Sequence, residues 1–162
     1  MSNPRELFEY ELSGIYDSER QIARMAGDVA DQIQDESIAR VLADQGGESE
    51  EQLTNLERCF TLMDTKPQSV TCYGIEGMRR QYDEIAERDP SADVRAMFLL
   101  SNASKITHYK IATYRALIDL AMAMGEAECA QLLRTNLVLD EERAGVLERL
   151  NHDLGQQLLA AV

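Results

Sequence analysis

Residues 4–33, PRELFEYELSGIYDSERQIARMAGDVADQI, contain the pattern that decides the fold. Apolar side chains recur every three or four residues, which is typical of a helix that buries one face. The positions of this stripe are Phe8, Leu12, Ile15, Glu19, Ile22, Ala26, Val29 and Ile33. Glu19 stands where a leucine is expected. A lone carboxylate in an apolar core costs several kcal/mol unless it is paired, hydrogen-bonded, protonated or bound to a metal.

Three further segments have a similar stripe, and polar or acidic residues interrupt each stripe near its midpoint. Their positions are Ile38, Val41, Gln45, Glu48, Gln52, Leu56, Cys59 and Met63; Leu100, Ala103, Thr107, Ile111, Tyr114 and Ile118; and Ala130, Leu133, Leu137, Asp140, Ala144 and Leu147. His108 adjoins the second of these interruptions, and Glu141 adjoins Asp140 in the last. Periodicity does not separate Asp140 from Glu141, so at most one of the two is expected to face inward.

These interruptions predict one polar site at the centre of a four-helix bundle. Glu19, Glu48, His108 and Glu141 all lie about half-way along their predicted helices. Midpoints of bundled helices coincide whether neighbouring helices run parallel or antiparallel. The four side chains are therefore candidates to meet at one level. Each has a competing interpretation. Glu19 could be a carboxylate at the edge of its stripe, Glu48 could belong to a polar seam, and His108 could be a histidine hydrogen-bonded to a neighbour.

Composition excludes several classes of protein. The formal charge of −13 argues against nucleic acid or an anionic membrane surface as a partner, because phosphate binding requires clustered lysine and arginine. No stretch has the length of a membrane span, and the first residues do not have the pattern of a signal peptide. We therefore expect a cytoplasmic protein. Cys59, Cys72 and Cys129 form no Cys-x-x-Cys pair and are predicted to be reduced, packed thiols.

Capping and helix-breaking residues predict four long helices and a shorter one. Asn3 is the expected first cap, followed by Pro4 and by Glu6 in a capping box. The helices are expected over about 4–33, 38–63, 72–87, 92–124 and from 126 to the last few residues. Gly46 and Gly47 fall inside the second helix, where they either allow a close approach or only weaken the helix.

Connection lengths predict the topology. The first two long helices are joined by a few residues, as are the last two, so each pair is expected to form an antiparallel hairpin. Residues 64–91 hold their own helix and are long enough to return along the bundle. We expect a single all-α domain over residues 1–162. Its fold is a ferritin-like four-helix bundle of two antiparallel hairpins, joined by a long crossover that carries the short extra helix.

Several segments resemble the YciF-like (YciE/YciF) branch of the ferritin-like superfamily. They are Glu11-Leu12-x-x-Ile15-Tyr16-Asp17-x-Glu19, Glu48-Ser49-x-x-Gln52, Leu56 to Phe60, Pro67 to Gly77, His108-Tyr109-x-Ile111-Ala112-x-Tyr114-Arg115, and Asn136-Leu137 to Asp140-Glu141. The resemblance covers nearly the whole chain. It implies a helical homodimer with a carboxylate-rich di-iron-type centre and a stress-associated role without a settled activity. It also favours Glu141 over Asp140 as the inward carboxylate.

The departures from the family pattern weaken the case for a metal. Family members resemble His-x-x-Glu where this chain has Gln45-x-x-Glu48, and Glu-His-Tyr-Glu where it has Thr107-His108-Tyr109-Lys110. Lys110 lies three residues after Thr107 and so on nearly the same face. An ammonium near the carboxylates would offset their charge and repel a metal cation. We therefore hypothesise that Lys110 replaces metal.

Three functions are compatible with these observations. The first is a non-enzymatic ferritin-like protein that acts through assembly or binding, with no cofactor. The second is an iron or manganese carboxylate protein that handles oxygen or peroxide, with Glu19, Glu48, His108 and Glu141 as ligands and with a small-molecule substrate that the sequence does not identify. The third is metal storage in a cage. Metal content and size in solution separate them.

Overall fold

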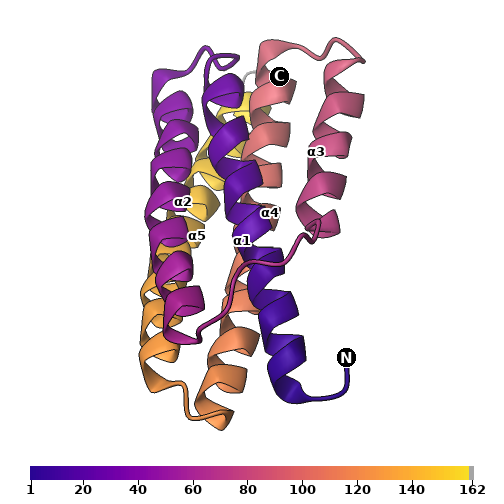
Figure 1. Ribbon diagram of the computed structural model, residues 1–162. Coiled ribbons are helices and arrows are strands. Elements are labelled where there is room, and N and C mark those ends of the chain that lie inside the picture. The colour runs from indigo at the N-terminus through magenta and orange to yellow at the C-terminus, as the bar shows by residue number, and fades with distance from the viewer. Residues whose placement is uncertain (161–162) are drawn as a thin grey trace.

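The computed structural model describes residues 1–160, except for the side chains of residues 27, 28 and 30. These residues form five α-helices: α1 (Pro4–Ala30), α2 (Glu36–Leu62), α3 (Tyr73–Ala86), α4 (Ala92–Ala123) and α5 (Ala127–Ala160). The four long helices make a bundle, and α3 lies outside it against α4 and α1 (Figure 1). No strand is formed in the described part of the chain. The predicted all-α class is confirmed.

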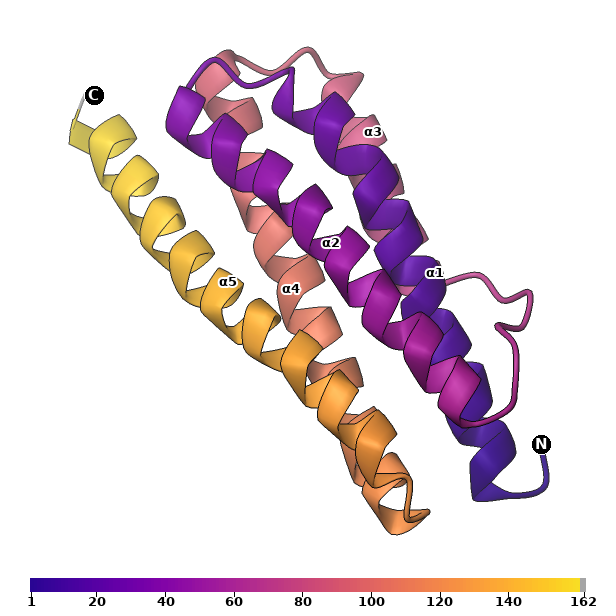
Figure 2. The same cartoon turned by 60° about the vertical axis from the view of Figure 1, so that its left-hand side comes forward.

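The topology is the one that the connection lengths predict. α1 pairs with α2 and α4 with α5 as antiparallel hairpins, and these are the two most extensive helix–helix contacts (Figure 2). Between the hairpins, the chain crosses α1 and then rises through α3, so that α2 and α4 run in the same direction (Figure 1). The ferritin-like arrangement of two hairpins and a crossover is therefore confirmed.

Short-range hydrogen bonds set the helix ends. Asn3 Oδ1 accepts from the backbone N–H of Glu6 at 2.9 Å, as predicted for a cap. The Glu6 carboxylate accepts hydrogen bonds from the backbone N–H of Ser2 and from the side-chain amide of Asn3. In the expected capping box it would accept from the backbone N–H of Asn3 instead. α1 ends at Ala30, three residues earlier than predicted. Asp35 then caps α2 by accepting from two backbone N–H groups.

The two glycines inside α2 differ in their surroundings. A Cβ atom added to Gly46 would stand 2.8 Å from the Cβ of Ala26 in α1, whereas one added to Gly47 would meet nothing within 4 Å. Gly46 therefore allows α1 and α2 to approach closely. Of the two roles that the sequence left open for these glycines, close approach is the one that Gly46 has. Gly47 has no such role.

The interior of the bundle is divided along its length. One end holds a large apolar core that includes Phe8, Leu12, Leu56, Leu117 and Leu133. The opposite end holds a second apolar core around Ile38, Leu42, Leu99, Leu100 and Leu147. Most of the buried polar residues of the four helices, among them Glu19, Gln52, Lys110 and Asp140, lie in the sequence between these cores.

The structure also bears on the predictions made for the cysteines and for membrane-spanning segments. All three cysteines are free and buried, as expected for packed thiols. Within residues 1–160, none of the helices combines the length and the apolar character needed to cross a bilayer.

Candidate functional site

The ammonium of Lys110 lies at the centre of the buried polar layer. Its Nζ atom is 3.0 Å from Glu19 Oε2, 2.8 Å from Asp140 Oδ1 and 2.7 Å from Gln52 Oε1. Lys110 is only 1% exposed, although lysine is one of the residue types that are least often buried in proteins. A lysine ammonium has three hydrogens to donate, and three oxygens from three other helices surround it. The cation therefore joins α1, α2 and α5 to its own helix, α4.

Glu19 is the fully satisfied acceptor of this layer. It has no exposed surface, because it replaces an apolar residue on the inner stripe of α1. Besides Lys110, the Ser49 hydroxyl donates to Oε2 and the Tyr114 hydroxyl donates to Oε1, both at 2.8 Å. A buried carboxylate needs partners of this kind to persist. The prediction that Glu19 faces the interior is confirmed.

Asp140 is the second carboxylate at the centre. Its Oδ1 atom contacts Lys110, whereas its buried Oδ2 atom has no hydrogen-bond partner among the described residues. Asp140 is 2% exposed, and the adjacent Glu141 is on the outside of the bundle. The position that the resemblance favoured is therefore corrected: Asp140, and not Glu141, faces inward.

A set of amides links α2 to α5 beside the charged groups. Gln52 Nε2 donates to the backbone oxygen of Asn136, and Asn136 Nδ2 donates to the backbone oxygen of Gln52, each at 3.1 Å. Asn136 Nδ2 also reaches the Tyr114 hydroxyl at 3.1 Å, and Asn55 donates to Asn136 Oδ1 at 2.8 Å. Because each amide is held on both sides, Gln52 presents its oxygen to Lys110 in a fixed orientation.

Electrostatics favour a protonated Lys110. Burial by itself lowers the pKa of Lys110, but the carboxylates of Glu19 and Asp140 outweigh it and raise that pKa overall. Burial also raises the pKa of Glu19 and of Asp140, against the attraction of Lys110. The pKa of Tyr114 is raised well above its ordinary value by burial and by Glu19. Tyr114 is therefore a neutral donor, and the one cation stabilises two carboxylates.

Glu48 lies next to the centre and not in it. Arg143 Nε donates to Glu48 Oε2 at 2.9 Å, Arg143 Nη2 contacts Oε1, and Arg143 Nη1 donates to the backbone oxygen of Val41 at 2.7 Å. The Glu48 carboxylate is thus occupied by a guanidinium fork, which is a strong geometry for an ion pair. It is oriented toward α5 through Arg143.

The remaining two predicted ligands are on the surface. His108 is exposed, with Nε2 3.7 Å from a carboxylate oxygen of Glu148. Glu141 is exposed and accepts from Arg115 Nη2 at 2.7 Å. The prediction that these two side chains converge with Glu19 is therefore wrong. His108 and Glu141 sit beside inward residues in the sequence, and one residue along a helix turns a side chain by about 100°.

The helical periodicity of the sequence contained a signal for Asp140 and Gln52, which were not among the predicted ligands, but none for Ser49. On α5 the buried positions are Cys129, Ala130, Leu133, Asn136, Asp140, Arg143, Ala144 and Leu147. A stripe drawn through Asn136 instead of Leu137 selects Asp140 and excludes Glu141. On α2, Ser49 and Gln52 share a face with Leu56 and are buried. Ser49 carried no signal of its own, because small polar residues are common on helix surfaces.

The donor set does not fit a di-metal centre. Such a centre draws a Glu from each of two helices and Glu-x-x-His from each of the other two. Here a protonated amine, which has no lone pair for a metal and repels cations, lies between the two inward carboxylates. Among the side chains that the structure describes, no group of three or more His, Cys, Asp and Glu residues could hold a metal ion. The metal chemistry that the family resemblance implies has no ligand set at this position.

The fold and the buried polar layer together define a ferritin-like helical-bundle protein with a charged interior. The family described as a domain of unknown function, DUF892, matches residues 3–160, and the chain belongs to this family.

One similar protein sequence and two similar crystal structures support the assignment to the YciF-like family. The chain is 27% identical to protein YciF of Escherichia coli strain K12 over 145 residues, which is 89% of this chain and 86% of YciF. The crystal structure of the E. coli stress protein YciF matches with a TM-score of 0.91 at 24% identity, over 96% of this chain and 99% of that one. The YcfI protein of Rhodopseudomonas palustris matches with a TM-score of 0.87 at 26% identity, over 91% and 94% of the two chains.

Proposed function

We propose that this chain is a non-enzymatic, stress-associated protein of the YciF type, in which Lys110 takes the place of a metal at the bundle centre. The observation that supports this is the position of the Lys110 ammonium, within 3.0 Å of oxygens from Glu19, Gln52 and Asp140. The stress association rests on the similarity to the E. coli protein, which is described as a stress protein. In this proposal the centre holds four helices together and carries out no redox chemistry.

Metal analysis tests the proposal against its alternative. The chain should be expressed in a medium rich in iron and manganese and purified without chelators, and bound metal should be measured per chain. We expect far less than one equivalent. Two stoichiometric metal ions per chain, with an iron-dependent near-ultraviolet absorption band, would overturn the proposal in favour of an oxidase or peroxidase of the di-metal type.

A variant with restored ligands is the matched control. Combining Gln45→His, Thr107→Glu and Lys110→Glu returns the family pattern at three positions and removes the central cation. We expect this variant to bind iron when the wild-type chain does not, because Glu19, Asp140 and the two introduced carboxylates then need a cation. If it binds none, the location assigned to the ancestral centre is wrong.

A role through assembly requires a partner, and we propose that the partner is a second copy of the chain. Apolar side chains that are more than a third exposed support this, notably Leu7 and Tyr10 on α1 and Tyr109 on α4. Burying them against a second chain would be favourable. Light scattering should give twice the mass of one chain at micromolar concentration. A monomer would contradict a dimer, and a much larger particle would favour storage in a cage.

A further inference from the structure

Two cysteines face each other between α2 and α5, and the proposed function does not use them. Cys59 and Cys129 are 0% and 1% exposed, and both are free thiols. The Cys59 thiol donates to the backbone oxygen of Cys129 at 3.6 Å. A hydrogen bond between the two side chains raises the pKa of Cys59 most, and burial raises it further. The two thiol groups are therefore in contact across the interface between these helices.

The register of α2 and α5 explains why the two thiols meet. Gln52 and Asn136 lie opposite each other, since each side chain donates to the backbone oxygen of the other at 3.1 Å. Cys59 follows Gln52 by seven residues, and Cys129 precedes Asn136 by seven. Seven residues are almost two helical turns, so in this antiparallel pair the cysteines also lie opposite each other. The close approach of the two helices at the amide pair thus continues to the cysteines.

Facing thiols in contact meet the first requirement of a disulfide, which joins side chains that point at each other over a short distance. Two hydrogen-bonded thiols have their sulfur atoms about 4 Å apart, and side-chain rotation can bring them to the bond length of about 2 Å. The third cysteine is placed differently. Cys72 donates to the Tyr109 hydroxyl at 3.4 Å, on the side of the bundle where α3 begins. Only Cys59 and Cys129 therefore form a pair.

We propose that Cys59 and Cys129 are a modification site, at which hydrogen peroxide forms a disulfide that ties the α1–α2 hairpin to the α4–α5 hairpin. Cys129 is in the first turn of α5, where the helix dipole stabilises negative charge, so its sulfur attacks as the thiolate. The attack breaks the O–O bond, releases one water and leaves a sulfenic acid. The Cys59 sulfur then displaces the hydroxyl as a second water. Two thiols are oxidised by two electrons, and their protons leave in the two waters.

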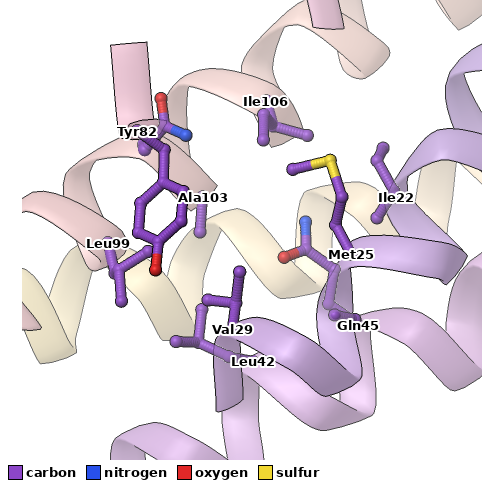
Figure 3. A pocket seen from close by; sticks show the side chains of 11 residues that line it. Ile22, Met25, Val29, Leu42, Gln45, Tyr82, Leu99, Ala103 and Ile106 are labelled. Atoms are coloured by element: carbon purple, nitrogen blue, oxygen red, sulfur yellow. The ribbon is translucent and has the colours of Figure 1, made fainter. Parts of the chain in front are cut away.

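Access to the thiols requires local opening, because both are buried. The pocket around Gln45 in Figure 3 has a volume of about 40 Å³, which is room for about one water molecule. It gives no route to the thiols, since Gln45 precedes Cys59 by fourteen residues, or about 21 Å along α2. Cys129 is near the beginning of α5, and helix ends open more readily than helix centres. We therefore expect slow oxidation that records sustained exposure to peroxide. This site does not depend on the group at the bundle centre.

The test uses the full chain with Cys72→Ala, so that Cys59 and Cys129 are its only thiols. The folded, reduced protein is incubated with hydrogen peroxide, quenched with catalase, unfolded and alkylated with iodoacetamide. We expect both thiols to disappear together, a pair of tryptic peptides joined through them, and full recovery with dithiothreitol. Thiols that persist even in urea just below the unfolding transition, where local opening is frequent, would overturn the proposal. A disulfide formed only between two chains would also overturn it.

A matched control removes one member of the pair. Cys59→Ala combined with Cys72→Ala keeps Cys129, which should end as a sulfenic or sulfinic acid without a joined peptide. Oxidation should raise the melting temperature of Cys72→Ala by about 5–15 °C, because the new bond closes a long loop in the unfolded chain. The control should show no such rise. If the control does not fold, the comparison of oxidised with reduced Cys72→Ala still decides the question. An unchanged or lower melting temperature after oxidation would contradict a tie between the hairpins.

Discussion

The apolar core around Leu12, Leu56 and Leu133 and the polar layer around Lys110 are built by the same helices, and both are fully buried. They differ in what keeps them stable. The core gains free energy from every apolar surface removed from water, whichever neighbours provide the burial. The polar layer gains only while each charge keeps its partners. The core should therefore tolerate changes of shape, and the layer should fail when one member is removed.

The largest expected effect comes from removing the cation alone. Lys110→Met keeps a similar volume but leaves Glu19 and Asp140 buried without a counter-charge, which should destabilise the fold by about 3–5 kcal/mol. Urea unfolding followed by circular dichroism measures the loss. The matched control is Lys105→Met, at an exposed position on the same helix, which should change stability by less than about 0.5 kcal/mol. A loss at position 110 no larger than at position 105 would show that the ammonium is dispensable.

In the apolar core, truncation and reshaping should differ. Leu133→Ala removes a fully buried side chain and should cost about 2–5 kcal/mol, since the cavity collapses only in part. Leu133→Met conserves volume and should cost less than about 1.5 kcal/mol. Unfolding of the two variants in parallel measures both. Equal losses would mean that this region also depends on specific partners, and would remove the contrast with the polar layer.

Acid should distinguish the two kinds of loss. Burial raises the pKa of Glu19 and Asp140, and Lys110 counteracts that rise, so Lys110→Met should raise both pKa values further. A carboxyl group with a raised pKa contributes most stability below its unfolded pKa of about 4, and that contribution is lost as the pH rises through the folded pKa. The deficit of Lys110→Met relative to wild type should therefore be at least about 1.4 kcal/mol smaller at pH 5 than at pH 8.

The deficit of Leu133→Ala is the control for this pH experiment, because no titrating group is removed. It should stay constant between pH 5 and pH 8 in the same urea series. If both deficits change together, the effect belongs to the stability of the whole chain. If neither changes, Glu19 and Asp140 do not respond to Lys110.

Replacing the whole charged set should have a small effect. Glu19→Leu, Lys110→Met and Asp140→Leu together remove both the attraction and the cost of desolvating three charges, and such exchanges are often neutral or stabilising. We expect the triple variant to recover most of the stability lost in Lys110→Met alone. Unfolding in urea at pH 7 checks this. A triple variant as unstable as the single one would mean that the hydrogen bonds of Ser49, Gln52 and Tyr114 carry the layer.

How far the sequence predicts this molecule depends on the length scale of each feature. Helix positions and the two hairpins follow from periodicity, caps and connection lengths, which are local or nearly so. Glu19 could be recognised as interior because it interrupts a long regular stripe. The stripe drawn through Leu137 did not separate Asp140 from Glu141, and the contact with Lys110 that marks Asp140 as the inward residue comes from α4, a different helix.

The pairing of Glu48 is a second feature that depends on distant residues. Arg143 is far from Glu48 in the sequence, and their contact follows only once α2 and α5 are side by side. The same holds for the reciprocal amide bonds of Gln52 and Asn136. Sequence alone indicated that a polar layer exists and that Lys110 belongs near it, but the choice of partners is a property of the packed bundle.

A crystal structure of protein grown with iron and manganese, with anomalous scattering measured at both absorption edges, would show whether Lys110 takes the place of metal. We predict no anomalous peak at the bundle centre, and a Lys110 Nζ atom within about 3 Å of Glu19, Gln52 and Asp140. An anomalous peak within about 2.2 Å of the Glu19 and Asp140 oxygens, with Lys110 turned away, would contradict it.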